Sequence, residues 1–133
     1  SALKRNTMKE YIFLFKGGKT DSASDQELDD HERAWDEWMD SLEEEGVLID
    51  GLPMKDHAVI VDKDGASARQ ESADDSVTGY LILETSDMEM AVEMAQDCPI
   101  FEFGGTIEVR ELESHLDDLN DDGDDDGFSD IAD

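Results

Sequence analysis

Two alternating apolar runs near the end of the folded part constrain the fold of this chain most. Residues 80–85 and 106–112 each place apolar side chains at every second position, which is typical of half-buried strands. Between them, Ser86 and Glu89 have the spacing of a capping box that opens a helix, and Pro99 prevents that helix from continuing far beyond Cys98. This segment therefore predicts a strand–helix–strand unit.

The first half of the sequence predicts a second unit of the same kind. Residues 9–16 form an apolar strand, and Ser24 with Glu27 gives another capping box for a helix that runs to about Glu45. Gly46 is placed as its left-handed cap. Short strands at residues 47–49 and 57–61 follow, and residues 62–78 contain a turn or an irregular hairpin. The order β-α-β-β-α-β predicts an α+β, ferredoxin-like fold: an antiparallel sheet with two helices on one face.

Strand periodicity divides the sheet residues into two sets, because alternate residues of a strand point to opposite faces. We expect the aliphatic set to lie under the two helices: Ile12, Leu14, Leu81, Leu83, Ile107 and Val109. The other set is rich in aromatic rings, which a monomer would not leave in water: Tyr11, Phe13, Phe15, Tyr80, Ile82, Glu84, Thr106, Glu108 and Arg110. The prediction is a homodimer, a dimeric α+β barrel whose two sheets enclose a pocket.

Net charge excludes some partners. The chain has a formal charge of −28, and the segment 113–133 carries acids but no lysine or arginine. Such a polyanion repels nucleic acid and anionic membrane surfaces, and no apolar run is long enough to span a bilayer. The acidity has two interpretations: solvation of a protein that works in high salt, or a surface for a cation or a basic partner. The single Cys98 forms no internal disulfide, which favours the cytoplasm.

These segments predict one domain over residues 8–112, a polar N-terminal extension over 1–7 and an acidic tail over 113–133. The tail resembles a calcium-binding repeat of thrombospondin type 3 modules, with weak candidate ligands at Asp122, Asp124, Asp126 and Asp130 around Gly127. The alternatives for the tail are a disordered acidic segment or a protein-interaction segment. No cofactor is expected in the domain itself.

The chain resembles the YCII-related (DGPF-domain) family. The resemblance rests on three stretches, MKEYIFLFKGG, AWDEWMDSLEEEGVLIDGLPM and VTGYLILETSDMEMAVEMAQDCPIFEFGGTIEVREL. It implies a ferredoxin-like barrel that dimerises through its sheets, and lyase- or dehalogenase-like activity on a small lactone or cyclic acid in some relatives. Of the DGPF element only Asp64-Gly65 is present. The histidine of the enzyme-like branch is replaced here by Trp35, which favours ligand binding over catalysis.

The candidate ligand-binding residues are Tyr11, Phe13, Tyr80, Glu108, Arg110 and Trp35. Arg110 suits a carboxylate clamp, and Glu108 or His57 suits a general base. Each has a structural alternative. Glu108 and Arg110 are equally suited to pair across a dimer interface, His57 to lie exposed at a strand end, and His31 to pack against Trp35. Trp35, Trp38 and Met39 at helical spacing fit either core or pocket wall.

Overall fold

The structure is a computed structural model that describes residues 8–68 and 76–113. Its main sheet has four antiparallel strands in the order β2-β5-β1-β6. They are β2 (Leu48–Pro53), β5 (Val77–Thr85), β1 (Lys9–Lys16) and β6 (Thr106–Glu111). The helices are α2 (Asp25–Glu44), α3 (Met88–Gln96) and a short 3-10 turn, η1 (Pro99–Phe103).

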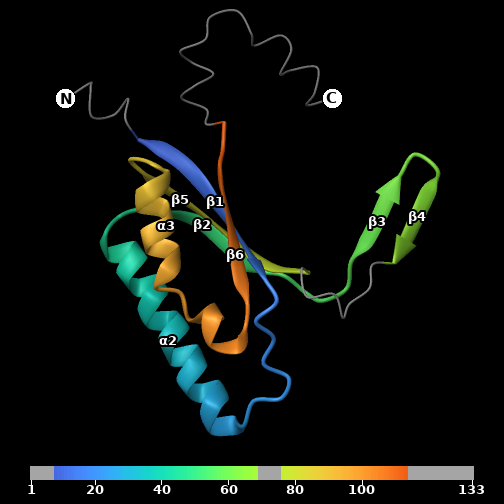
Figure 1. The fold of residues 1–133 in the computed structure, drawn as a ribbon, viewed down its shortest axis with the longest axis horizontal. Coiled ribbons are helices and arrows are strands. Elements are labelled where there is room, and N and C mark those ends of the chain that lie inside the picture. Colours follow the sequence, from blue (N-terminus) through green and yellow to red (C-terminus); the bar gives the residue numbers. More distant parts are fainter. Residues whose placement is uncertain (1–7, 69–75, 114–133) are drawn as a thin grey trace, which may run out of the picture.

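Two interleaved β-α-β units make up this sheet. β1 and β2 both run antiparallel to β5, so they are parallel to each other, and α2 connects them. In the same way β5 and β6 are parallel, with β1 between them and α3 in the connection. Both helices lie on one face of the sheet (Figure 1). The predicted α+β, ferredoxin-like fold is therefore confirmed. None of the described helices is long and apolar enough to cross a membrane.

The α2 helix begins and ends where the sequence predicts. The Ser24 hydroxyl accepts a hydrogen bond from the Glu27 amide, and the Glu27 carboxylate accepts one from the Ser24 amide, which completes the capping box. Gly46 has a φ of 75°, the left-handed conformation that glycine adopts at low cost after a helix. No basic residue lies in the last turn.

Other boundaries differ from the prediction. α3 is capped by Asp87 and not by Ser86: the Asp87 carboxylate accepts the Met90 amide at 2.9 Å. β2 is longer than the predicted strand at 47–49 and passes through Asp50-Gly51, with an irregularity between Leu48 and Asp50. The 3-10 turn η1 after Cys98 was not predicted, although Pro99 at its start is a typical first residue of a helical turn.

The assignment of the sheet faces from the sequence is partly wrong. Tyr11 and Phe13 are fully buried and Phe15 nearly so, and all three lie under the chain's own helices. Tyr11 is the cross-strand partner of Leu83, and Phe13 that of Leu81, and directly opposed residues share a face. The β1 aromatic rings are therefore on the helix face with Leu81, Leu83, Ile107 and Val109, and Ile12 and Leu14 are on the other face.

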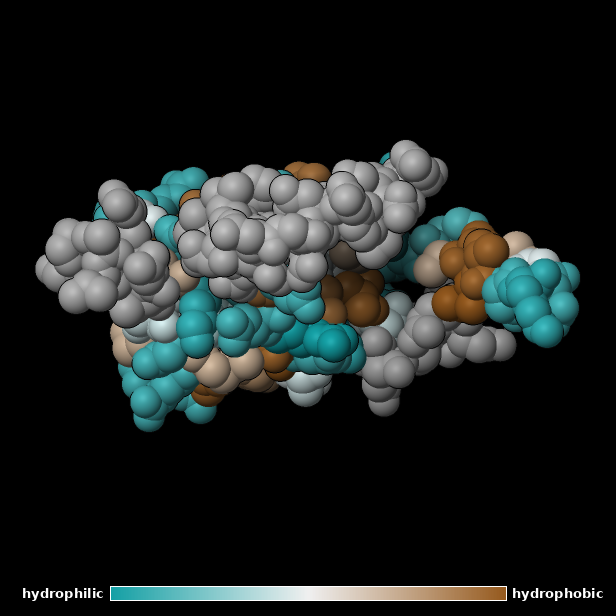
Figure 2. All heavy atoms as spheres, turned by 90° about the horizontal axis from the view of Figure 1, so that it is seen from above, coloured by the Kyte–Doolittle hydropathy of each residue, from teal (hydrophilic) through white to brown (hydrophobic). Residues whose placement is uncertain are grey.

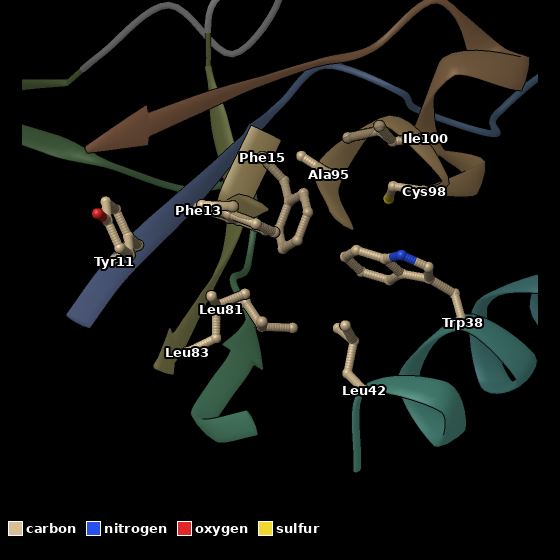
Figure 3. Packing of buried hydrophobic residues seen from close by; sticks show 11 residues of the cluster. Tyr11, Phe13, Phe15, Trp38, Leu42, Leu81, Leu83, Ala95, Cys98 and Ile100 are labelled. Atoms are coloured by element: carbon tan, nitrogen blue, oxygen red, sulfur yellow. The ribbon is translucent and has the colours of Figure 1, made fainter. Parts of the chain in front are cut away.

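Aromatic packing explains why β1 turns its rings inward. Phe13 stacks on Trp38 of α2 with ring centroids 6.4 Å apart, and Phe15 meets the same indole edge-on at 6.1 Å. Figure 3 shows these rings together with Leu42, Leu81 and Leu83 between the sheet and α2. Three buried rings remove more apolar surface from water than Ile12 and Leu14 would in their place.

The opposite side of the sheet, called here the open face, has no described helix on it (Figure 1). Cross-strand pairing places half-buried apolar residues along its centre: Ile12 opposite Ile82, and Leu14 opposite Tyr80. Glu108 and Arg110 of β6 lie on the same face, opposite Leu14 and Ile12. The open face is therefore apolar in the middle, charged along β6, and acidic at Asp50 and at the opposed pair Glu10 and Glu84.

A separate two-stranded hairpin extends the connection between β2 and β5. It consists of β3 (Val59–Asp62) and β4 (Gly65–Ala68), and it projects away from the body (Figure 1). We call residues 59–68 the arm. The segments 1–7 and 114–133, predicted as an extension and most of an acidic tail, lie outside the described residues. So do the calcium candidates Asp122, Asp124, Asp126 and Asp130.

Replacing the central ring tests the corrected face assignment. Phe13→Ala is expected to lower the free energy of unfolding by about 3–5 kcal/mol, because it leaves a cavity beneath Trp38. Chemical denaturation followed by far-UV circular dichroism measures this. Val92→Ala on the outer side of α3 is the matched control and should change stability by less than about 0.5 kcal/mol. A Phe13→Ala protein as stable as the control would show that this ring is not in the core.

Candidate ligand pocket

A cavity of about 300 Å³ lies on the helix side of the sheet, next to the C-terminal end of β1 and the N-terminal end of β5. α2 and η1 close it from one side and the neighbouring ends of β1, β2 and β5 from the other. Its walls are almost entirely apolar or backbone: Phe15, Gly17, Gly18, Trp35, Met39, Gly51, Leu52, Pro53, Thr78, Gly79, Tyr80, Leu81 and Ile100. The volume is at the lower end of the range for small-molecule sites.

Aromatic contacts hold one wall of this pocket in place. Trp35 and Trp38 lie on the same side of α2 because they are three residues apart, and their rings meet edge-to-face at 5.5 Å. Phe15 contacts Trp35 edge-on at 5.2 Å. Trp38 donates its indole N–H to the Met94 carbonyl at 3.1 Å, which ties α2 to α3. The Trp35 wall is therefore supported by the core behind it.

His31 fixes the orientation of Trp35. The Trp35 indole N–H donates to His31 Nε2 at 2.9 Å, so Nε2 must be unprotonated and Nδ1 carries the hydrogen. Nδ1 lies 3.2 Å from Glu102 Oε1 and donates to it. Because His31 is buried and both of its nitrogens have partners, it acts as a support for Trp35, in agreement with the packing alternative for this residue.

Glycines let the walls of the pocket approach each other closely on the sheet side. Gly17 and Gly18 both have a φ of 68°, which turns β1 sharply away from the sheet. A Cβ atom on Gly18 would lie 2.5 Å from Ile100 Cγ1, and one on Gly51 would lie 2.8 Å from the Tyr80 carbonyl oxygen. Side chains at either position would clash with the walls, so glycine is required for both the turn and the close packing.

Polar groups are scarce in the pocket. The Thr78 hydroxyl is within 3.3 Å of the carbonyl oxygens of both Phe15 and Gly17 and can donate to one of them. Tyr80 is the only titratable residue among the described lining residues. Across residues 8–68 and 76–113 there is also no group of three or more His, Cys, Asp or Glu side chains suited to hold a metal ion.

The structure separates the predicted ligand-binding residues. Trp35 lines the pocket from α2, and Tyr80 borders it from β5, although its pairing with Leu14 puts the Tyr80 side chain on the open face. Tyr11 and Phe13 do not, because they are enclosed in the core. Burial raises the pKa of Tyr11, with nearby Glu111 and Asp87 adding to the rise, and its hydroxyl has no hydrogen-bond partner in the described structure. The expectation that Tyr11 orients a ligand on the open face is therefore wrong.

Glu108 and Arg110 lie on the open face, away from the pocket. Lys16 Nζ is 2.5 Å from Glu108 Oε1, and Arg110 Nη1 is 3.7 Å from Glu108 Oε2. The hydrogen bond and charge of Lys16 hold the pKa of Glu108 below its usual value against the opposing effect of desolvation, and Arg110 adds the smallest lowering. A lowered pKa makes a carboxylate a weaker base, which reduces its suitability for general base catalysis.

His57, the other candidate base, is exposed on a second, wider hollow. That hollow is lined by Lys16, Met54, Lys55, Asp56, His57, Ala58, Ser76 and Val77. It is more polar than the pocket and contains none of the pocket's aromatic rings. The two candidate bases, His57 and Glu108, are therefore not among the residues that line the pocket.

Several pocket residues were not predicted from the sequence. Ile100 and the pair Gly17-Gly18 line it without having been predicted to, whereas Met39 fits the pocket-wall alternative given for it. A usable signal existed: two adjacent glycines directly after an aromatic strand end, with Trp35 and Met39 four residues apart on a helix stripe. The position of η1, which brings Ile100 over the glycines, had no such signal.

The fold and site define a ferredoxin-like α+β domain with a small apolar pocket between its first helix and the end of its sheet. The chain belongs to the family described as YCII-related domain, whose model matches residues 10–114. No protein among curated sequences matches it.

One solved structure with some similarity is a 5-chloro-2-hydroxyhydroquinone dehydrochlorinase from Burkholderia phenoliruptrix AC1100, in complex with 2,5-dihydroxybenzoquinone. The identity is 14%, the TM-score is 0.48, and the match covers 80% of this chain and 96% of the other.

Removing Lys16 tests the cause of the lowered Glu108 pKa. In Lys16→Met the hydrogen bond and the positive charge are lost, so the pKa of Glu108 should rise toward its ordinary value, as followed by carboxyl ¹³C NMR titration. Because the folded-state pKa is depressed, the stabilisation from this pair is present above the unfolded-state pKa and is lost as pH falls through the folded-state pKa. Arg33→Met, distant from β6, should leave the Glu108 titration unchanged, and an unchanged titration in Lys16→Met would refute the assignment.

Proposed function

We propose that this chain is a small-molecule-binding homodimer and that the helix-side pocket is its binding site. The observation that carries the binding proposal is the pocket's construction: an aromatic wall held by the Trp35–His31 hydrogen bond and ring contacts on one side, and a closely packed backbone wall that requires glycine on the other. A rigid, largely apolar concavity with few polar groups is typical of sites for small organic ligands. We therefore propose this helix-side pocket as the binding site, in place of the inter-sheet pocket predicted from the sequence.

Shape and polarity suggest the kind of ligand. A cavity of about 300 Å³ between flat indole and phenyl rings suits a molecule with one or two rings. The Thr78 hydroxyl and the backbone groups of the glycines supply the only polar contacts among the described walls. The ligand is therefore expected to be mostly apolar, with a hydrogen-bonding group at its Thr78 end.

Binding is favoured over catalysis because Tyr80, whose side chain is on the open face, is the only titratable residue along the described walls. A lyase or dehalogenase that moves a proton needs a positioned acid or base within hydrogen-bond reach of its substrate. The described lining has no His, Asp, Glu, Lys or Cys, and Trp35 stands at the helix position where the family resemblance implies a histidine in the enzyme-like branch. The enzyme alternative thus receives no support from the residues around this pocket.

The homodimer proposal rests on the open face. Ile12, Leu14, Tyr80 and Ile82 form an apolar strip across its two central strands, on the side of the sheet opposite the helices. Charge favours the same face: α2 carries ten carboxylates and a single arginine, whereas the open face carries Lys16 and Arg110 with four carboxylates, Glu10, Asp50, Glu84 and Glu108. Two copies meet with least repulsion through their open faces, with the acidic α2 surfaces pointing outward.

A thermal-shift screen of small cyclic compounds and carboxylic acids tests the pocket. A ligand at 100 times its Kd should stabilise the protein by about 2.7 kcal/mol, which raises the Tm by about 10 °C for a domain of this size. Met39→Trp fills the pocket and should abolish the shift. Glu43→Gln, exposed on the same helix, should keep it.

Arg110→Ala distinguishes the two faces in the same screen. A shift that survives in Met39→Trp but disappears in Arg110→Ala would place the ligand on the open face and contradict the pocket proposal. A shift lost only in Met39→Trp is the expected result.

Light scattering tests the assembly. We expect the mass of two chains at micromolar concentration in molar KCl, where salt screens the repulsion between two strongly acidic copies. Lower salt should shift the equilibrium toward single chains. A single-chain mass at every salt concentration would refute the homodimer while leaving the pocket proposal intact.

A further inference from the structure

We propose that the arm, the β3–β4 hairpin, clasps a second copy of this chain by lying against that copy's open face. This inference rests on the proposed homodimer and adds to it a specific element that holds the two copies together. The arm is formed by residues that the four-stranded sheet does not use: it is inserted between Pro53, the last residue of β2, and Val77, the first of β5.

The arm has one apolar face, formed by Val59, Val61, Ala66 and Ala68, and carries Ile60 beside Ser67 on the other. Val59 and Val61 point to one side and Ile60 to the other, because side chains alternate along a strand. Their exposed fractions are 51%, 73% and 47%, and the β4 residues opposite them are alanines and a serine. Figure 2 shows these apolar residues gathered on the projecting hairpin, apart from the body. A run of β-branched residues exposed in this way is typical of a surface that another molecule covers.

Among the described residues, the arm also has little support from the rest of its own chain. β3 and β4 contact each other, and neither packs extensively against any other helix or strand in the described residues. A two-stranded hairpin alone is only marginally stable in water, even with a well-formed turn. Here the turn is well formed: the Asp62 carboxylate accepts the Asp64 amide at 2.8 Å, and Gly65 has a positive φ of 148°. A defined hairpin with an uncovered apolar face fits an element stabilised on assembly.

Charge identifies the second copy as the occupant. Over its ten residues the arm carries Asp62, Asp64 and Lys63, a net charge of −1 in a chain of −28. The open face is much less acidic than α2: Lys16 and Arg110 lie beside the apolar strip, together with four carboxylates, Glu10, Asp50, Glu84 and Glu108. The arm therefore meets far less repulsion at a partner's open face than at α2, whose ten carboxylates face one arginine.

Two-fold symmetry makes this contact reciprocal. In a closed dimer each surface patch of one copy meets the partner in the same way, so each copy gives one arm and receives one. The arm emerges from the β2–β5 edge region, next to strands that carry the apolar strip. Contact through the open faces thus brings the arm of each copy toward the sheet of the other.

The chain provides a clean background for a cross-linking test. Cys98 is its single cysteine and is buried, and burial raises the pKa of the thiol to about 12. A buried thiol with so high a pKa reacts slowly with maleimides near neutral pH. A cysteine introduced on the surface is then the reactive one.

The first experiment measures the dimer dissociation constant by analytical ultracentrifugation of the full chain in molar KCl. Val61→Asp should raise it at least about tenfold, because a valine side chain buried in the dimer is replaced by a charge. Val61 is largely exposed in the single chain, so the variant should fold normally and its far-UV circular dichroism spectrum should be unchanged. Gln26→Glu adds the same charge on α2 and should leave the constant unchanged.

The second experiment locates the arm. Two differently tagged chains, one with Val61→Cys and one with Arg110→Cys on the open face, are mixed and treated with a short bis-maleimide. We expect a cross-linked product that carries both tags. Replacing the Arg110→Cys chain by one with Glu37→Cys, on the outer side of α2, should give no mixed product.

The outcomes separate this inference from the homodimer itself. A dimer that Val61→Asp does not weaken, or in which the mixed Val61–Arg110 product fails to form, overturns the role of the arm and leaves the dimer standing. A protein that is monomeric at all salt concentrations overturns both. Weakening by Val61→Asp together with the mixed product supports the clasp.

Discussion

The inward direction of the β1 aromatic rings is the constraint on which the rest of this structure depends. β1 is a central strand that pairs with β5 on one side and β6 on the other, so its register fixes the faces of both neighbours. With Phe13 and Phe15 inside, Trp38 packs between them and sets the position of α2 over the sheet. Trp35, three residues earlier, is then held at the end of β1, where the chain turns away at Gly17-Gly18. The pocket is formed by this series of contacts, each of which depends on the one before.

The order of elements was predictable because each has a local signal. The capping box at Ser24, the left-handed Gly46 and the alternating strands all depend on neighbours within a few residues. Small shifts arose where two residues compete for one role. Ser86 and Asp87 are both good N-caps, and the geometry at the end of β5 selects Asp87.

The faces of β1 were not predictable in the same way. Every residue from Tyr11 to Phe15 is apolar, so alternation gives two sets but does not say which set is inside. Only pairing with β5, which opposes Phe13 to Leu81, decides it. The residues of the pocket were hard to predict for the same reason, because their contacts are nonlocal. Trp35 was among the candidates because of its position on α2, but Met39, Ile100 and the glycines meet it only once α2, η1 and the sheet are packed. Site residues whose contacts are nonlocal cannot be obtained from periodicity.

The charge on α2 has a consequence for how that helix is held in shape. Its C-terminal end carries Glu43, Glu44 and Glu45, at the pole where the helix macrodipole is already negative, and no basic residue lies in the last turn to compensate. As an isolated peptide, this segment would have unfavourable charges at the negative end of its dipole, and it would be largely non-helical. In the protein the helix is stabilised by the packing of Trp38 and Leu42 against the sheet. Secondary and tertiary structure in this part of the molecule must therefore form, and melt, together.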